Sequence, residues 1–264
     1  MSLAPLIDAH IHLDSYAKAQ QEMILDGLGE AGVESLVAVS MHWESARANL
    51  RLAEQYPSRV HPAFGFHPEQ PIPDPAEIDR FLAWMKRHAG DMVAVGEIGL
   101  PYYTRTEAEE AGRPFDSRPY EELLERFIVF AREEDKPVVL HAVYEDADTA
   151  CRLLAQYGIK RAHFHWFKGS PDTVKHMASQ GYYISFTPDI DYEPEIQELA
   201  RTFPAELVMS ETDGPWPFEG PFTGQMTHPR MTAEVALAWS RIQGLSLQEA
   251  RRILYDNAKR FYGI

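Results

Sequence analysis

Residues 6–12 read LIDAHIH, a short run of mainly apolar residues that contains histidines at positions 10 and 12. Side chains two positions apart on a β-strand point to the same side of the strand. A strand over Leu6–His12 would therefore direct His10 and His12 to one side, where two imidazoles can bind one metal ion. The segment predicts a strand with a candidate metal site at its C-terminal end.

Runs of the same kind recur along the chain, and helical patterns fill the gaps between them. The further strand candidates are Ser35–Met41, Val60–Phe66, Met92–Ile98, Pro137–Val143, Ala162–Trp166, Tyr182–Thr187 and Glu206–Ser210. Strands that alternate with helices predict a parallel sheet, and eight such units predict closure into an α/β TIM-like (β/α)8 barrel. Because such a barrel needs roughly 250 residues, we expect residues 1–264 to form a single domain. The alternative is an open doubly wound sheet, but neither GxGxxG nor GxxxxGK(S/T) follows any of these runs.

Several helix starts can be read from the sequence. Asp74-Pro75 and Ser170-Pro171 each offer an N-cap followed by a proline in the first turn, and Ser246 to Glu249 form a capping box. The longest stretch that looks irregular is Pro101–Pro119, which follows the fourth strand candidate. A long loop on that side of a barrel could act as a lid over the active site.

Composition restricts the partners. There are 40 acidic and 25 basic residues, giving a net charge of −15, so we expect no extended groove for duplex DNA. A small phosphorylated substrate or a nucleic-acid end stays open, because divalent metals would supply positive charge locally. No apolar run is long enough to span a bilayer, and we expect no membrane partner. The single cysteine, Cys151, excludes an intrachain disulfide and fits a cytoplasmic location.

Residue types that ligate metals recur where strands are predicted to end. In addition to His10 and His12, they are His67, Glu97, His141, His165 and Asp213. Barrel enzymes keep their catalytic groups at the C-terminal ends of the strands. The pattern therefore predicts one or two divalent ions, with Zn, Mn and Mg all open because the ligands mix histidine and carboxylate. His163 shares a face with His165 but lies deeper, and we interpret it as a core residue or a support behind the ligands.

These segments together resemble the TatD family of metal-dependent hydrolases over the full length of the chain. The matching segments are IDAHIHLD at 7–14, FGFHPE at 64–69, GEIGL at 96–100, VVLH at 138–141, HWFKG at 165–169, ETDGP at 211–215 and DNAKRFYGI at 256–264. The resemblance implies a TIM-like barrel with one or two divalent metals. It also implies hydrolysis of phosphodiester bonds, in this family often deoxyribonuclease activity.

The resemblance also implies a role for each matched residue. His10, His12 and Asp213 would hold one metal, His141 and His165 would hold the second, and Glu97 would bridge the two. His67 would line the substrate site, and Asp8 would orient a ligand from behind.

Three positions depart from the family pattern. Val143 stands where the family usually has Arg, Pro101 where it often has Asp, and Lys168 where Ser is common. The metal ligands are thus retained while the substrate contacts differ, which puts a DNA substrate in question more than hydrolysis. Two interpretations of Lys168 stay open: it neutralises an anionic group of the substrate, or it is a solvated surface lysine.

Three functions remain open at this stage. In the first, the metals lower the pKa of a water, Asp213 takes its proton and Glu97 bridges the ions, so that a phosphodiester is hydrolysed. The second is an amidohydrolase-type enzyme that cleaves an amide, a lactone or another ester. Many such sites bridge their metals with a carboxylated lysine, whereas here Glu97 occupies that strand. The third is a non-enzymatic metal-binding scaffold, for which Val143 is the only indication.

Overall fold

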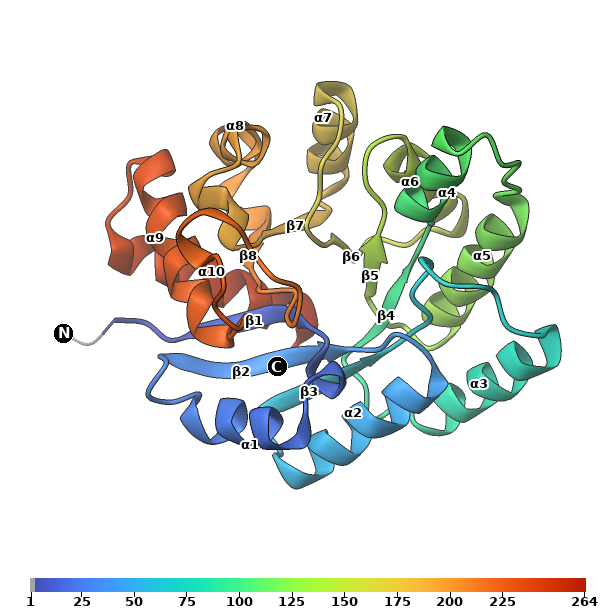
Figure 1. Ribbon diagram of the computed structural model, residues 1–264, viewed down its shortest axis with the longest axis horizontal. Coiled ribbons are helices and arrows are strands. Elements are labelled where there is room, and N and C mark those ends of the chain that lie inside the picture. Colours follow the sequence, from blue (N-terminus) through green and yellow to red (C-terminus); the bar gives the residue numbers. More distant parts are fainter. Residues whose placement is uncertain (1–2) are drawn as a thin grey trace.

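Each of the eight predicted strands forms and pairs in parallel with the next one along the chain (Figure 1). The strands are β1 (Leu6–Ile11), β2 (Val33–Val39), β3 (Val60–Phe64), β4 (Ala94–Gly99), β5 (Val138–His141), β6 (Ala162–Phe164), β7 (Tyr183–Phe186) and β8 (Val208–Ser210). The computed structural model describes residues 3–264, so Met1 and Ser2 of the predicted domain lie outside the described residues. The fold is a TIM-like barrel, as the alternation predicted.

Backbone hydrogen bonds join the first strand to the segment that follows the last one. The Asp213 amide donates to the His10 carbonyl at 2.9 Å, and the His12 amide donates to the Gly214 carbonyl at 2.8 Å. These bonds lie just beyond the C-terminal end of β8 and bring the first and last strands together at that end of the barrel. The open doubly wound sheet is therefore excluded.

The helices lie around the strands (Figure 1). Within residues 3–264 the α-helices are α1 (Lys18–Gly27), α2 (Trp43–Gln55), α3 (Pro75–Arg87), α4 (Tyr102–Glu110), α5 (Arg118–Glu133), α6 (Glu145–Tyr157), α7 (Pro171–Gln180), α8 (Pro194–Thr202), α9 (Thr232–Gln243) and α10 (Leu247–Tyr262). Short 3-10 turns occupy η1 (Leu13–Ser15), η2 (Pro188–Asp191), η3 (Ala205–Leu207), η4 (Gly220–Phe222) and η5 (Pro229–Met231). None of the helices described is both long and apolar enough to cross a membrane.

The three predicted helix starts are confirmed. Asp74 accepts a hydrogen bond from the Ala76 amide at 2.8 Å, and Ser170 accepts one from the Thr173 amide at 3.1 Å. At the start of α10, Ser246 and Glu249 each bond the other's backbone amide, at 3.3 and 3.0 Å, which is the predicted capping box. These bonds satisfy amides that the first helical turn leaves without a partner.

The prediction that Pro101–Pro119 is irregular is wrong, because α4 occupies the first half of this segment. The segment TRTEAEE contains good helix formers. In addition, the carboxylate of Glu69 accepts hydrogen bonds from the Tyr103 and Thr104 amides at 2.8 and 2.7 Å. A carboxylate at a helix N-terminus stabilises the helix through these bonds and through the helix dipole. An ordered helix, and not a long loop, therefore stands beside the active-site end of the barrel.

Candidate active site

Five imidazoles surround the buried carboxylate of Glu97 at the C-terminal end of β4. The distances from an imidazole nitrogen to a carboxylate oxygen are 2.7 Å for His165, 3.1 Å for His141, 3.2 Å for His10 and His12, and 3.5 Å for His67. These histidines come from the ends of β1, β3, β5 and β6. The barrel thus gathers side chains that are far apart in the sequence around one carboxylate.

Gly65, just after β3, makes room for this arrangement. A Cβ atom at Gly65 would collide with the backbone carbonyl of Glu97. Because a backbone oxygen in a strand cannot move aside cheaply, only glycine allows this close approach. The FGFHPE segment therefore contributes to the position of Glu97 as well as supplying His67.

Asp213 approaches the same centre from the end of β8. Its Oδ1 atom lies 3.3 Å from Nε2 of both His10 and His12. Its backbone has a φ of 48°, in the left-handed region that L residues other than glycine, asparagine and aspartate rarely adopt. The bond from the Asp213 amide to the His10 carbonyl holds this conformation. Aspartate tolerates this conformation better than most residues, because its short side chain can hydrogen-bond locally.

The donor atoms of these residues form three groups that could each hold a metal ion. The groups are His10, His165 and Asp213; His10, His12 and Glu97; and His67, Glu97 and His141, with the donor atoms of each group within 4.8 Å of one another. All six predicted ligands meet here. His67 differs from the expectation, because it joins a candidate ligand group in addition to lining the pocket.

The same atoms pass a test of fit to a metal. Several buried polar atoms at the centre have no hydrogen-bond partner within residues 3–264: both ring nitrogens of His10 and of His12, Nδ1 of His165, Oε2 of Glu97 and Oδ1 of Asp213. Leaving buried polar atoms without partners is costly unless another group satisfies them. Imidazole nitrogens and carboxylate oxygens without partners are suitable donors for a divalent cation.

Electrostatics at the centre keep the carboxylates ionised. Burial alone would raise the pKa of Glu97, but His165, His67 and His10 hold it well below its usual range. Burial likewise opposes ionisation of Asp213, yet the imidazoles of His10 and His12 beside it lower its pKa. His12 has its pKa raised to about 10, because Asp213 and Glu97 outweigh its burial. Ionised carboxylates are the form that binds cations, and metal binding would release the proton of His12.

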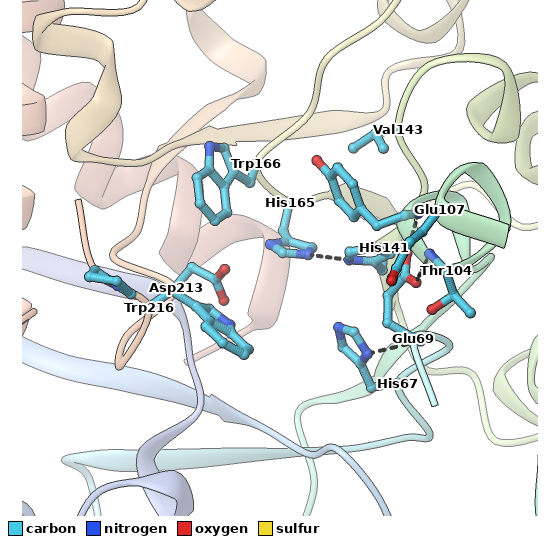
Figure 2. A pocket seen from close by; sticks show the side chains of 12 residues that line it. His67, Glu69, Thr104, Glu107, His141, Val143, His165, Trp166, Asp213 and Trp216 are labelled. Atoms are coloured by element: carbon cyan, nitrogen blue, oxygen red, sulfur yellow. Dashed lines mark hydrogen bonds and ion pairs between the residues drawn. The ribbon is translucent and has the colours of Figure 1, made fainter. Parts of the chain in front are cut away.

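A pocket of about 470 Å³ opens above this centre (Figure 2). Its lining residues are His67, Glu69, Tyr103, Thr104, Glu107, His141, Val143, His165, Trp166, Asp213, Trp216 and Pro217. Figure 2 shows the two tryptophans on either side of Asp213, across the pocket from Glu69, Thr104 and Glu107. Val143 faces the pocket, as its position two residues after His141 predicted.

Lys168 does not line this pocket, so the structure does not support a role in neutralising the substrate. It borders a separate cavity of about 600 Å³ beside α7 and α8. The chain turns sharply after His165 because Trp166 has a φ of 38°. This turn places the Trp166 side chain at the pocket, while the Lys168 carbonyl accepts a hydrogen bond from the Tyr144 amide at 2.6 Å.

Comparison with known proteins shows the family of this chain. The family model described as TatD related DNase matches residues 7–263. The chain belongs to the TatD family. A relative from Haemophilus influenzae named as an uncharacterized metal-dependent hydrolase is 35% identical to this TatD-family chain over 257 residues, covering 97% of the chain and 99% of that protein. The human protein named Deoxyribonuclease TATDN3 is 26% identical, covering 97% and 94% of the two chains. The crystal structure of YJJV, a TatD homolog from Escherichia coli, superposes with a TM-score of 0.87 at 24% identity and full coverage of both chains, which supports the fold.

In this TatD-family barrel Asp8 supports the backbone that carries Asp213. Its carboxylate accepts hydrogen bonds from the Thr212 amide at 2.9 Å and the Thr212 hydroxyl at 2.5 Å. The expected role of Asp8 is to orient a ligand from behind. Its contacts place it against Thr212, the residue that precedes the candidate ligand Asp213. Their burial makes this pairing a rigid link between β1 and the end of β8.

Two carboxylates that touch candidate ligands were not predicted from the sequence. Oε1 of Glu69 lies 3.2 Å from Nε2 of His141. Burial would raise the pKa of Glu69, but hydrogen bonds from His141 and Thr104 outweigh it and lower the pKa to about 2. Glu211 accepts a hydrogen bond from the Trp166 amide at 2.8 Å and lies 3.6 Å from Nδ1 of His165. Carboxylates behind histidine ligands fix the ring orientation. Glu69 lies in the FGFHPE segment and Glu211 in the ETDGP segment. Their place in these two motifs was the sequence signal from which a role at the site could have been predicted.

His163 is a core residue, as one of the two interpretations held. It is fully buried, and its ring nitrogens lie 2.9 Å from the Tyr262 hydroxyl and 2.6 Å from the Ser185 hydroxyl. Both of its nitrogens therefore have partners, in contrast to those of His10 and His12. It contributes to the packing of α10 against the barrel.

We expect the purified protein to bind one or two divalent ions per chain, and chelation to lower its melting temperature by several degrees. An ion at about 100 times its Kd stabilises the folded state by about 2.7 kcal/mol, and each kcal/mol shifts the melting temperature of a chain of this size by roughly 2–4 °C. Elemental analysis and thermal unfolding with and without chelator measure both effects. His165→Ala should lower the metal content, whereas His176→Ala, at an exposed position on α7, should not. Equal metal content in the two variants would contradict the assignment.

Proposed function

We propose that this TatD-family protein is a divalent-metal-dependent phosphodiesterase acting on a small phosphorylated substrate or a nucleic-acid end. We further place it in the cytoplasm, a location that cell fractionation would test. The observation that carries the enzymatic proposal is the cluster of buried, unpartnered donor atoms around Glu97 at the base of an open pocket. A non-enzymatic metal-binding scaffold would not need an open pocket next to its metal ligands.

The chain's own residues supply the remaining parts of a hydrolytic site. A divalent ion, when bound, supplies Lewis-acid chemistry by polarising a phosphoryl oxygen and lowering the pKa of water. Asp213 lines the pocket beside His10 and His12 and is ionised there, so an oxygen atom is free to accept a proton. We assign it the acceptance of a proton from the attacking water. Glu97 lies deeper and holds the histidines around one negative charge.

The phosphodiester assignment takes support from the name of the human relative, a deoxyribonuclease. An amide or lactone substrate is the competing possibility. Elemental analysis should be followed by a screen of activated phosphodiesters, amides and lactones with the identified metal restored. Metal-dependent turnover of a phosphodiester above the other classes supports the proposal. Turnover of amides or lactones alone would replace it, and no turnover of any class would favour a metal-binding scaffold.

Val143 is expected to weaken contact with nucleic-acid phosphates, and Val143→Arg should restore it. Val143 lines the pocket and has no donor, whereas Arg offers a planar fork of N–H groups. A hydrogen bond to a charged group contributes roughly 1.5–3 kcal/mol, or roughly ten- to a hundredfold in kcat/KM. The measurement is the ratio of kcat/KM on an oligonucleotide to that on a small activated phosphodiester, at fixed ionic strength.

The control for this variant is Val143→Leu, which adds volume without a donor. Because Val143 is only 3% exposed, the added side chain alone can lower both activities. Such a steric effect would act on both substrates and leave the ratio unchanged. A ratio that stays at the wild-type value in folded, metal-loaded Val143→Arg would show that position 143 does not contact the substrate phosphate.

A further inference from the structure

The pocket has exposed aromatic side chains that nothing in the metal centre requires. Trp216 and Tyr103 are 49% and 50% exposed and are among the few large apolar side chains exposed within residues 3–264. Both line the pocket, and Trp166 lies across Asp213 from Trp216 (Figure 2). Exposed aromatic rings that line a cavity are typical of surfaces on which a ligand ring stacks.

The two tryptophans differ in how firmly they are held. The Trp166 indole nitrogen donates to Asp189 at 2.5 Å, and its ring centroid lies 5.5 Å from that of Phe218. Trp216 is fixed at its backbone, since its amide donates to the Asp213 carbonyl at 3.2 Å. Its indole remains half exposed beside the proposed proton acceptor. A flat ring can therefore stack on Trp216 next to the reacting centre.

The side of the pocket across from the two tryptophans, where α4 carries Tyr103, is acidic. Glu107 on α4 is exposed and forms no ion pair within the part of the chain that the structure describes. Arg105, on the same helix, is turned to Glu145 at 2.8 Å and Asp146 at 3.1 Å. Neither lysine nor arginine is among the pocket-lining residues found in residues 3–264. A second phosphate placed there would face carboxylates without a cation to offset them.

On the basis of the phosphodiesterase activity proposed above, we propose that the pocket selects a small phosphodiester with one phosphate and a flat, nucleobase-like ring. The ring lies against Trp216 and Trp166, and the single phosphate lies at the metal centre. Further phosphates are disfavoured by Glu107. A dinucleoside monophosphate has this chemistry, whereas an extended polynucleotide does not.

The aromatic part of the proposal is tested with Trp216→Leu and Trp216→Phe. The substrates are thymidylyl-thymidine and its analogue that lacks both bases, each assayed with the metal-loaded protein. Stacking on one base corresponds to roughly 5- to 150-fold in binding. We expect Trp216→Leu to lower kcat/KM for the dinucleotide by an amount in that range, mainly through KM, and to leave the baseless analogue nearly unchanged. Trp216→Phe keeps a ring and should retain most of the preference.

The charge part is tested by adding phosphates to both ends of thymidylyl-thymidine. Wild-type protein should cleave the added-phosphate form less well, by an amount on the order of fivefold at low ionic strength. Glu107→Gln should narrow this difference, and added salt should do the same. Glu110→Gln is the matched control, because Glu110 is exposed on the same helix but does not line the pocket.

Each outcome separates this inference from the proposed function. The inference is overturned if Trp216→Leu lowers kcat/KM equally for the dinucleotide and for its baseless analogue. It is also overturned if wild-type protein cleaves the added-phosphate form better than thymidylyl-thymidine. In both cases the proposed phosphodiester hydrolysis stands. If metal-loaded protein cleaves no diester, the proposed function fails. Binding then decides the inference: calorimetry should give a lower Kd for thymidine 5′-monophosphate than for 2-deoxyribose 5-phosphate, and equal Kd values would overturn it.

Discussion

Asp213→Asn is expected to lower kcat by about 10²–10⁴-fold, the usual cost of losing a general base. The substitution preserves shape but removes the charge and the ability to accept a proton. Asparagine also tolerates the left-handed backbone at this position, where φ is 48°. The free energy of unfolding should therefore change far less than the activity does.

Two measurements distinguish loss of the proton acceptor from loss of the metal. Elemental analysis of Asp213→Asn should still find metal, because the group His10, His12 and Glu97 does not include position 213. Asp191→Asn, at an exposed aspartate at the end of η2, is the matched control and should behave as wild type. Turnover by Asp213→Asn at nearly the wild-type rate would show that another group accepts the proton.

Glu97→Gln is expected to weaken metal binding and to raise the Kd for the metal by about 10²–10⁴-fold. This carboxylate is fully buried and faces five imidazoles, so the substitution removes the one charge they share. Removing one partner of a buried charged pair costs about 3–5 kcal/mol, which corresponds to that range of affinity. The metal is first removed with a chelator, and the metal-free protein is then titrated with the metal in a calorimeter. The titration measures the change in Kd directly.

The same substitution at Glu211 is the control for Glu97→Gln. Glu211 is equally buried, but among the candidate ligands it touches only His165, at 3.6 Å. Residues that support a ligand from behind typically contribute 10–100-fold to metal affinity. A loss at Glu211 as large as that at Glu97 would mean that Glu97 is not the central ligand of the site.

The sequence was sufficient for the strands and the ligands because both depend on local pattern. Alternation along a strand places His10 and His12 together, and strand ends collect Glu97 and Asp213 at one end of the barrel. The helix α4 escaped prediction because its N-terminus is capped by Glu69, 34 residues earlier in the chain. The role considered for Lys168 came from its place in a family motif, but the positive φ of Trp166 turns the chain so that Lys168 borders another cavity. The contact of Glu69 with α4 is tertiary, whereas the helix formers within α4 were a local signal that the prediction did not use.

The hydrogen bond between the Asp213 amide and the His10 carbonyl has a consequence for the order of events during synthesis. The first ligands leave the ribosome early, but their partner on the last strand emerges near the end of translation. In addition, the Tyr262 hydroxyl at the end of α10 donates to the Ala9 carbonyl at 2.9 Å, so β1 acquires its final support only from the C-terminal helix. A nascent chain that stops before β8 can hold His10 and His12 but cannot close the barrel around an ion. Metal loading should thus follow release of the finished polypeptide, and a bound ion would mark chains that have completed folding.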